Sequence, residues 1–352
     1  MYKVGICGHF GWGKDFADGQ TDKTRAVYRA LSKALGEENI TTLDTCGWKS
    51  NPAAMFLNCR KLLKNCENVI MMPAQGGVKI FPALYELFNR KLNRRLHYVV
   101  VGGWLPEKLK SNPALYECIS RLDKVYVELQ PMEDALHELG LDNVIYLPNF
   151  RETNSLRPEE LVYTSCEPYR LCTFSRVTPQ KGIEKAIDAV RYANNALGRT
   201  VYTLDIYGKV APEYADEFSR LCKGFEPYIT YKGLADTAKS TQELKSCFAL
   251  LFPTLYSGEG LAGTVIDAFA AGVPVIATDW NYNRYIIRNG KDGIVYDPNT
   301  EGLLGKILVD AAGYPHKLND MKKNCLNRAA HFEADQAVKI LLKELEKEAV
   351  TV

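Results

Sequence analysis

Hydrophobic residues in the first half of this chain fall into short continuous runs, with segments of helical spacing between them. Such runs are typical of strands that are buried on both faces of a parallel sheet. They predict strands at Lys3–Cys7, Asn39–Leu43, Asn68–Met72, His97–Val101, Lys124–Glu128 and Asn143–Leu147. The helical spacing predicts helices over residues 21–35, 53–64, 79–92, 115–122 and 132–139. This alternation predicts a doubly wound α/β domain with helices on both faces of its sheet.

The same alternation returns after a polar segment, residues 151–170, which we interpret as an interdomain connection. Strands are predicted at Leu171–Ser175, Val201–Tyr207, Ile229–Lys232, Ala249–Phe252 and Val273–Ala277. Helices are predicted from Ile183, over residues 262–271, and from Leu318 to the end. At 352 residues the chain is long for one domain, so we expect two. The predicted domains cover residues 1–150 and 151–330, followed by a C-terminal helix over residues 331–352.

The loop Ser257–Thr264, which joins the strand Ala249–Phe252 to the next helix, contains three glycines and a carboxylate. Glycines let a ligand approach the backbone, and the first free N–H groups of a helix form an anion site. Thr264 adds a hydroxyl. Glu259 and Asp267, about two helical turns apart, could face one crevice and accept hydrogen bonds from sugar hydroxyls. A helix cap at a tight junction would explain the same residues without any ligand.

A second candidate site follows the first strand of the second half. Arg176 stands at the end of that strand, and Lys181 follows five residues later at a helix start. Two cations at such a crevice suit a pyrophosphate, because a departing nucleoside diphosphate needs its charge stabilised.

These motifs resemble the donor site of the retaining GT-B glycosyltransferases, family 4 in particular (glycosyl transferases group 1). That family shows an apolar strand, Pro-Ser/Thr, E-G-F-G-x-x-x-x-E, and a helix ending in A-x-G-x-P-V-I-A-T. The matching residues here are Phe252-Pro253-Thr254, Glu259-Gly260-Leu261-Ala262, Asp267 and Val273-Pro274-Val275-Ile276-Ala277-Thr278. The family pattern G-R-x-x-x-x-K-G is matched by Ser175-Arg176 and Lys181-Gly182.

The resemblance implies a GT-B fold, in which two Rossmann-like doubly wound domains face a central cleft and the last helix crosses back to the first domain. It implies a hexosyltransferase-type enzyme (EC 2.4) that retains the anomeric configuration. The expected donor is a nucleotide diphosphate sugar, with UDP favoured. The expected acceptor is a hydroxyl of a glycan or a lipid-linked sugar, in cell-surface polysaccharide synthesis.

The resemblance also implies residue roles. Arg176 and Lys181 would hold the donor phosphates, Glu259 the hydroxyls of the donor sugar, and Asp267 the ribose. The full donor-binding set would be Gly19, Gln20, Lys232, Gly233, Leu234, Gly260, Leu261, Ala262, Gly263, Thr264 and Asp267, beside the catalytic Glu259, Arg176 and Lys181. Because the phosphates have cationic partners and the chain has no D-x-D motif, we expect no essential metal and no cofactor.

The chain departs from the family pattern in several places. Asp267 replaces a glutamate, and Ala262 replaces a glycine. The segment Trp280–Tyr285 stands where the family has Gly-Gly and Pro-Glu. These departures leave the recognised sugar, the acceptor and activity itself open. Trp104 stands in a loop where many members carry a histidine, so no catalytic histidine is predicted.

Three other interpretations remain. A nucleotide-sugar epimerase would use the same fold without an acceptor, and an inactive GT-B scaffold would only bind partners. A P-loop ATP-binding protein is suggested by Gly8, Gly13 and Lys14. However, a P-loop needs Ser or Thr next to the lysine to hold Mg²⁺, and this chain has Asp15 there.

Composition narrows the classes of partner. A net charge of +2 does not favour nucleic acid. We find no run of 18 apolar residues and no signal-peptide pattern, so a cytoplasmic location is expected. The ten cysteines are scattered without metal-ligand spacing, which favours free thiols and no structural zinc.

One segment is locally basic. Residues 60–110 contain ten Lys and Arg against three Asp and Glu, with Arg90, Lys91, Arg94 and Arg95 grouped near the end of a predicted helix. A solvated helix face explains this charge. The alternative is peripheral docking on the inner face of a membrane, where each such charge contributes about 1 kcal/mol on anionic lipid.

Overall fold

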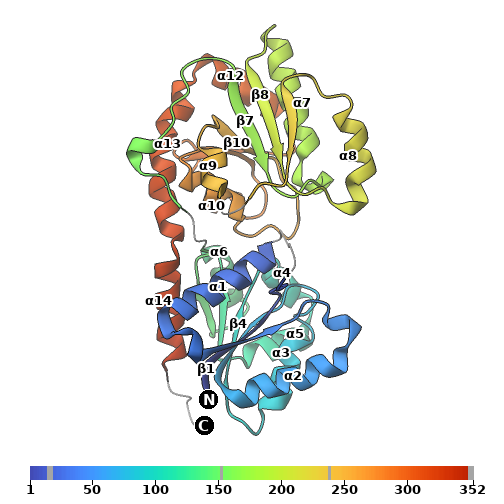
Figure 1. Ribbon diagram of the computed structural model, residues 1–352, viewed down its shortest axis with the longest axis vertical. Helices are drawn as coiled ribbons and strands as arrows, with labels where there is room; N and C mark the ends of the chain where they lie inside the picture. Colours follow the sequence, from blue (N-terminus) through green and yellow to red (C-terminus); the bar gives the residue numbers. More distant parts are fainter. Residues whose placement is uncertain (14–18, 151–153, 237–238, 348–352) are drawn as a thin grey trace. The chain divides into compact units, whose positions relative to one another are not determined.

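The structure is a computed structural model that describes residues 1–13, 19–150, 154–236 and 239–347. These residues form two compact units, shown as ribbons in Figure 1. The first unit comprises the described residues of Met1–Glu152, Gly258–Leu261 and Phe332–Val352. The second comprises those of Thr153–Ser257 and Ala262–His331.

The described part of the first unit contains one six-stranded sheet, in which all strands are parallel and follow the order β2-β1-β3-β4-β5-β6. Its strands are β1 Tyr2–Gly8, β2 Ile40–Asp44, β3 Cys66–Met72, β4 Arg95–Val99, β5 Lys124–Val127 and β6 Val144–Tyr146. Its α-helices are α1 Gly19–Leu35, α2 Pro52–Asn65, α3 Phe81–Asn89, α4 Leu105–Lys110, α5 Pro113–Ser120, α6 Gln130–Glu138 and α14 Ala334–Leu345.

Helix α14 comes from the far end of the chain and packs beside α1 over this sheet (Figure 1). Leu341 of α14 is buried in one cluster with Leu31 of α1 and Ile6 of β1. Hydrogen bonds from Arg95 of β4 hold the last turn of α14 against the sheet. The Arg95 guanidinium donates to the Glu344 carbonyl and, at 2.7 Å, to the Lys347 carbonyl. The first unit therefore depends on a C-terminal segment for part of its core.

Arg95 is consequently buried, with 9% of its surface exposed, and it also lies 3.5 Å from the Asp123 carboxylate. Including it in an exposed basic surface was wrong, because strand β4 directs its side chain to the end of α14. Arg90 and Lys91 are exposed, whereas Arg94 is half-buried.

The second unit repeats the architecture. Among its described residues, six parallel strands follow the order β12-β11-β10-β7-β8-β9. The strands are β7 Tyr169–Phe174, β8 Tyr202–Tyr207, β9 Ile229–Gly233, β10 Ala249–Phe252, β11 Val275–Thr278 and β12 Gly293–Tyr296. The α-helices are α7 Ile183–Ala196, α8 Ala215–Cys222, α9 Ser240–Leu244, α10 Gly263–Ala270, α11 Asn283–Ile286, α12 Leu303–Gly313 and α13 His316–Ala329.

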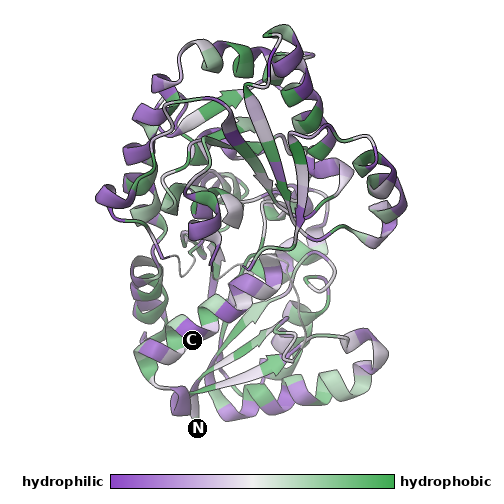
Figure 2. Ribbon diagram, turned by 45° about the horizontal axis from the view of Figure 1, so that its top comes forward, coloured by the Kyte–Doolittle hydropathy of each residue, from purple (hydrophilic) through white to green (hydrophobic). Residues whose placement is uncertain are grey.

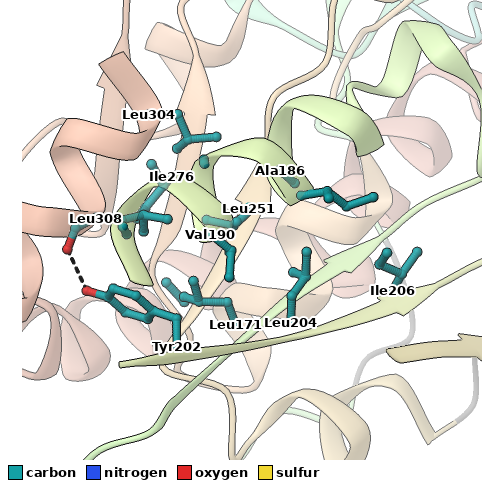
Figure 3. Packing of buried hydrophobic residues seen from close by; sticks show 14 of the residues in the cluster. Leu171, Ala186, Val190, Tyr202, Leu204, Ile206, Leu251, Ile276, Leu304 and Leu308 are labelled. Carbon is teal, nitrogen blue, oxygen red and sulfur yellow. Dashed lines mark hydrogen bonds between the residues drawn. The ribbon is translucent and has the colours of Figure 1, made fainter. Parts of the chain in front are cut away.

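The core of the second unit lies where α7 and α12 pack together over its sheet (Figure 3). Leu171 and Leu204 from neighbouring strands meet Val190 of α7 and Leu304 of α12. The buried Tyr202 hydroxyl donates to the Leu308 carbonyl at 2.7 Å, which satisfies a polar group inside this core. In Figure 2 hydrophobic colour concentrates in the strands, while the outer helices show both colours. The predicted doubly wound architecture is confirmed for each unit.

Several predicted element bounds were wrong. The C-terminal residues do not form one helix from Leu318: α13 ends at Ala329, a 3₁₀ turn covers Ala330–Phe332, and Glu333 is extended before α14. Helix α3 ends at Asn89, before the predicted residue 92. The Asn89 side chain bonds both backbone groups of Arg94, and Asn93 has φ 48°, which together turn the chain out of the helix.

Candidate functional site

In the second unit the chain reverses its direction of winding at β7. Strands β8 and β9 lie on one side of β7, whereas β10, β11 and β12 lie on the other. In open α/β sheets, ligands bind outside the carboxyl ends of the strands at such a switch point. The loops after β7 and β10 carry Arg176, Lys181 and the start of α10, so the sheet order places these predicted site residues on adjacent strands.

The loops after β7 and β10 are tightly packed against each other. The Leu255 N–H donates to the Gln180 carbonyl at 2.8 Å. Gly182 has φ 71°, and a Cβ at this position would lie only 2.2 Å from the Pro253 carbonyl oxygen. Glycine is required here for two reasons: another residue would be strained at this positive φ, and its Cβ would overlap the Pro253 backbone. The loop bearing Lys181 is therefore fixed against the end of β10.

The Lys181 ammonium lies over two aromatic rings, 5.7 Å from the Phe252 centroid and 5.0 Å from the Tyr256 centroid. Such cation–π contacts attract the ammonium to the ring faces and restrict a flexible side chain. Arg176, at the end of the neighbouring strand, is exposed. The carboxyl ends of the strands thus carry two cationic side chains, one exposed and one held over two rings.

Helix α10 adds a positive helix terminus at the same edge. Its N-cap is Ala262, whose side chain cannot accept a hydrogen bond from the first turn. Within the described residues, the Thr264 hydroxyl oxygen is buried and has no hydrogen-bond partner. Backbone N–H groups without an intrahelical partner and this hydroxyl are the donors that an anionic oxygen requires. Asp267, one turn further along α10, is buried with 1% of its surface exposed.

The residues predicted at the nucleobase follow β9. Gly233 has φ 75°, and its carbonyl accepts from the Gly208 N–H at 2.8 Å. Lys232 and Leu234 are exposed. Strand β9 is two places from β7 in the sheet, which corresponds to about 10 Å. A group of nucleoside size can span this separation.

The departure at residues 280–285 has a structural role. The Trp280 indole N–H donates to the Tyr256 carbonyl at 3.0 Å, and the Asn281 amide donates to the Ser257 carbonyl at 3.2 Å. Thr278 donates to the Thr254 carbonyl at 2.6 Å. These bonds hold the loop after β10 in place from the end of the adjacent strand β11 and from the residues that follow it.

In the first unit, Gly19 and Gln20 begin α1, directly after undescribed residues. The Gln20 amide donates to the Met72 carbonyl at the end of β3, at 3.2 Å. Strand β1 lies between β2 and β3, so Gln20 stands at the switch point of this sheet. Lys14 and Asp15, on which the P-loop interpretation depends, lie outside the described residues.

The segment Gly258–Leu261 groups with the first unit. Its Glu259 is buried, with 7% of its surface exposed. The Leu261 N–H donates to the Glu128 carboxylate at 3.0 Å, and the Leu261 carbonyl accepts from the Asn149 side chain at 3.0 Å. Glu128 and Asn149 were not among the predicted site residues. The available signal was a carboxylate at the carboxyl end of a predicted strand.

The described residues contain no group of three or more His, Cys, Asp and Glu side chains with metal-site geometry. No helix in the described part of the chain combines the length and hydropathy that crossing a membrane requires.

Residues 168–309 match the family model described as glycosyl transferases group 1. The resemblance predicted from the motifs is confirmed over this segment, which contains Arg176, Lys181 and Asp267. Over 146 residues the chain is 33% identical to the GtfA subunit of a UDP-N-acetylglucosamine–peptide N-acetylglucosaminyltransferase of Streptococcus gordonii, covering 41% of this chain and 27% of that protein. Over 165 residues it is 27% identical to an exopolysaccharide phosphotransferase of Streptomyces coelicolor, covering 47% and 17%.

A similar solved structure is HepE of Anabaena in complex with UDP and glucose. It superposes with a TM-score of 0.73 at 14% identity, over 97% of this chain and 98% of that one. At this identity the likeness concerns the fold, which is GT-B. The chain spans about a quarter or less of the length of the curated relatives it matches.

Proposed function

We propose that this chain is a glycosyltransferase whose second unit binds a UDP-sugar. The reason is that residues 168–309 match the group 1 glycosyltransferases. One observation carries the proposal: Arg176 and Lys181 follow β7, and the uncapped N-terminus of α10 follows the adjacent strand β10. The two cationic side chains and the N–H groups of this helix terminus can donate hydrogen bonds to a diphosphate at the switch point of the sheet. UDP is favoured because the names of the relatives specify UDP.

In the proposed reaction, the bond between the anomeric carbon and the diphosphate breaks as an acceptor hydroxyl attacks. Charge develops on the leaving UDP, and preorganised cations and N–H groups stabilise this charge. Arg176, Lys181 and Thr264 would serve this role. Glu259 would accept hydrogen bonds from sugar hydroxyls, Asp267 from the ribose, and the loop Lys232–Leu234 would contact the base.

We further propose that the sugar is transferred with retention, by attack on the face that the diphosphate leaves, so that the leaving phosphate accepts the proton of the acceptor hydroxyl. No protein base and no metal are then needed. The proposed acceptor is a hydroxyl of a glycan or a lipid-linked sugar in cell-surface polysaccharide synthesis. The exopolysaccharide named for the Streptomyces relative supports this choice.

The test is a thermal-shift panel with UDP, GDP, ADP, CMP and ATP-Mg²⁺ on the whole chain, since a ligand at 100 Kd stabilises by about 2.7 kcal/mol. We expect stabilisation by UDP that is lost in Arg176→Ala. The matched control is Arg220→Ala, because Arg220 is exposed on α8 and is not among the predicted site residues. Equal UDP stabilisation in both variants would contradict the site.

The same panel tests the P-loop rival, and turnover assays with a UDP-sugar test the other two. Stabilisation by ATP-Mg²⁺ alone, lost in Lys14→Ala, would favour the P-loop interpretation. An epimerase would convert a UDP-sugar to its epimer without an acceptor. An inactive scaffold would bind UDP without any turnover.

A further inference from the structure

The loop Gly258–Leu261 is held in the first unit by side chains from two strand ends. Glu128 follows β5, and one of its carboxylate oxygens accepts the Leu261 N–H at 3.0 Å. Asn149 follows β6, and its amide donates to the Leu261 carbonyl at 3.0 Å. Both backbone polar groups of Leu261 are therefore bonded to side chains.

The second oxygen of Glu128 forms a buried ion pair. The Lys23 ammonium of α1 lies 2.8 Å from it, and the two side chains are 4% and 3% exposed. Removing one partner of such a pair leaves an uncompensated buried charge, which is strongly destabilising. The pair holds the carboxylate in one place while its other oxygen accepts from Leu261.

Shape reinforces these bonds. A Cβ on Gly260 would lie 2.0 Å from the bonded Glu128 oxygen and 2.9 Å from the Gly103 nitrogen. A Cβ on Gly102 would lie 3.0 Å from the Gly258 carbonyl oxygen. The loop fits against Glu128 only because these positions lack side chains.

We infer that Glu128, held by Lys23 and assisted by Asn149, is a positioning residue for Glu259. This inference rests on the proposed function, in which Glu259 binds the donor sugar. Glu259 precedes Gly260 directly, so the bonds to Leu261 and the packing of Gly260 against Glu128 restrict where its backbone can lie. Displacement of a sugar-binding group by about 1 Å can cost about 100-fold in rate.

Two double variants test the role of the Glu128 oxygen at equal charge. Lys23→Met/Glu128→Gln removes both buried charges and keeps an oxygen that can accept from Leu261. Lys23→Met/Glu128→Leu removes the same charges and the acceptor. We expect the Leu variant to release UDP about 10- to 100-fold more slowly than the Gln variant. The substrate is UDP-glucose or UDP-N-acetylglucosamine, whichever the whole chain hydrolyses, with water as the acceptor.

Two further measurements separate positioning from general damage. UDP affinity should be equal in both double variants, because Arg176, Lys181 and α10 are untouched. Hydrogen exchange at the Leu261 amide should be faster in the Leu variant. If the Leu variant does not fold, Asn149→Ala is used in its place, because this change leaves the ion pair intact. Compared with the unaltered chain, Asn149→Ala should release UDP more slowly and bind UDP equally well.

Equal hydrolysis rates and equal Leu261 exchange in the two double variants would overturn the inference. A failed proposed function has a different outcome, in which the unaltered chain neither binds UDP nor hydrolyses either sugar nucleotide. In that case faster exchange at Leu261 in the Leu variant would still support the positioning of the loop, and unchanged exchange would reject it.

Discussion

Gly182 offers a quantitative test of how the loops after β7 and β10 are packed. Its φ of 71° lies in the left-handed region, where a residue with a Cβ costs about 1–2 kcal/mol. In Gly182→Ala the new Cβ would also lie 2.2 Å from the Pro253 carbonyl oxygen, which is backbone and cannot turn away. Forcing an atom into such a site typically adds a cost of about 1–3 kcal/mol.

The matched control is Gly198→Ala. Gly198 follows α7 in the same unit and has φ 66°, but a Cβ on this residue would have no atom within 4 Å. It therefore incurs the backbone cost without the overlap. The two variants should differ in unfolding free energy by about 1–3 kcal/mol, with Gly182→Ala the less stable.

Scanning calorimetry of both variants measures this difference. For a unit of this size, 1 kcal/mol shifts the melting temperature by roughly 2–4 °C. Relief of the overlap by movement of Pro253 would also displace the rings under Lys181, so Gly182→Ala should bind UDP more weakly than Gly198→Ala. Equal melting temperatures and equal UDP affinities would refute the packing described for these loops.

Three other predictions concern separate parts of the molecule. Trp280→Phe keeps an aromatic ring but removes the donor to the Tyr256 carbonyl. We expect calorimetry to show about 0.5–1.5 kcal/mol less stability, and UDP to stabilise this variant less. The control is Tyr285→Phe, because the Tyr285 side chain is exposed. Burial, with Arg95 and Lys124 nearby, lowers the pKa of His97 to about 3. Because the unfolded chain takes up this proton near pH 6.5 and the folded chain does not, the unfolding free energy should fall by up to about 1.4 kcal/mol per pH unit as the pH drops from 6.5 toward 3. Between pH 7 and pH 5 the urea midpoint should therefore fall less in His97→Gln than in the unaltered chain. Arg90→Ser/Lys91→Ser should sediment less with anionic vesicles than the control Arg220→Ser/Lys223→Ser, which removes two basic residues at the end of α8. Equal sedimentation of the two variants would contradict membrane docking and favour a solvated helix face.

The fold was predictable where strands are central and buried on both faces. Strand β10, Ala249–Phe252, is fully buried and was predicted with its observed bounds. Strand β12, Gly293–Tyr296, was missed. It lies at the edge of its sheet, and its two middle residues are half-buried. Its apolar run, Ile294-Val295-Tyr296, is shorter than the run of about four to eight residues that indicates a buried strand.

The placement of the candidate site residues was predictable only where they are close in sequence. Arg176 and Lys181 belong to one loop, and their spacing alone indicated paired cations at a helix start. Glu128 was missed because its partners are remote: 133 residues separate it from Leu261, and 105 separate it from Lys23. Hydrophobic periodicity identifies the strand that Glu128 follows but does not show which distant backbone the carboxylate contacts.

The glycines of the motifs have a different meaning in the structure from the one that their sequence suggested. Gly182 and Gly260 each lie where a Cβ would overlap protein atoms, at Pro253 and at Glu128 respectively. Their presence is explained by packing, with or without a ligand. The indications of an anion are instead the two cations and the buried Thr264 hydroxyl that has no partner within the described chain. Substitutions at these glycines should therefore act first on stability, whereas substitutions at Arg176 and Thr264 should act on UDP affinity with little loss of stability.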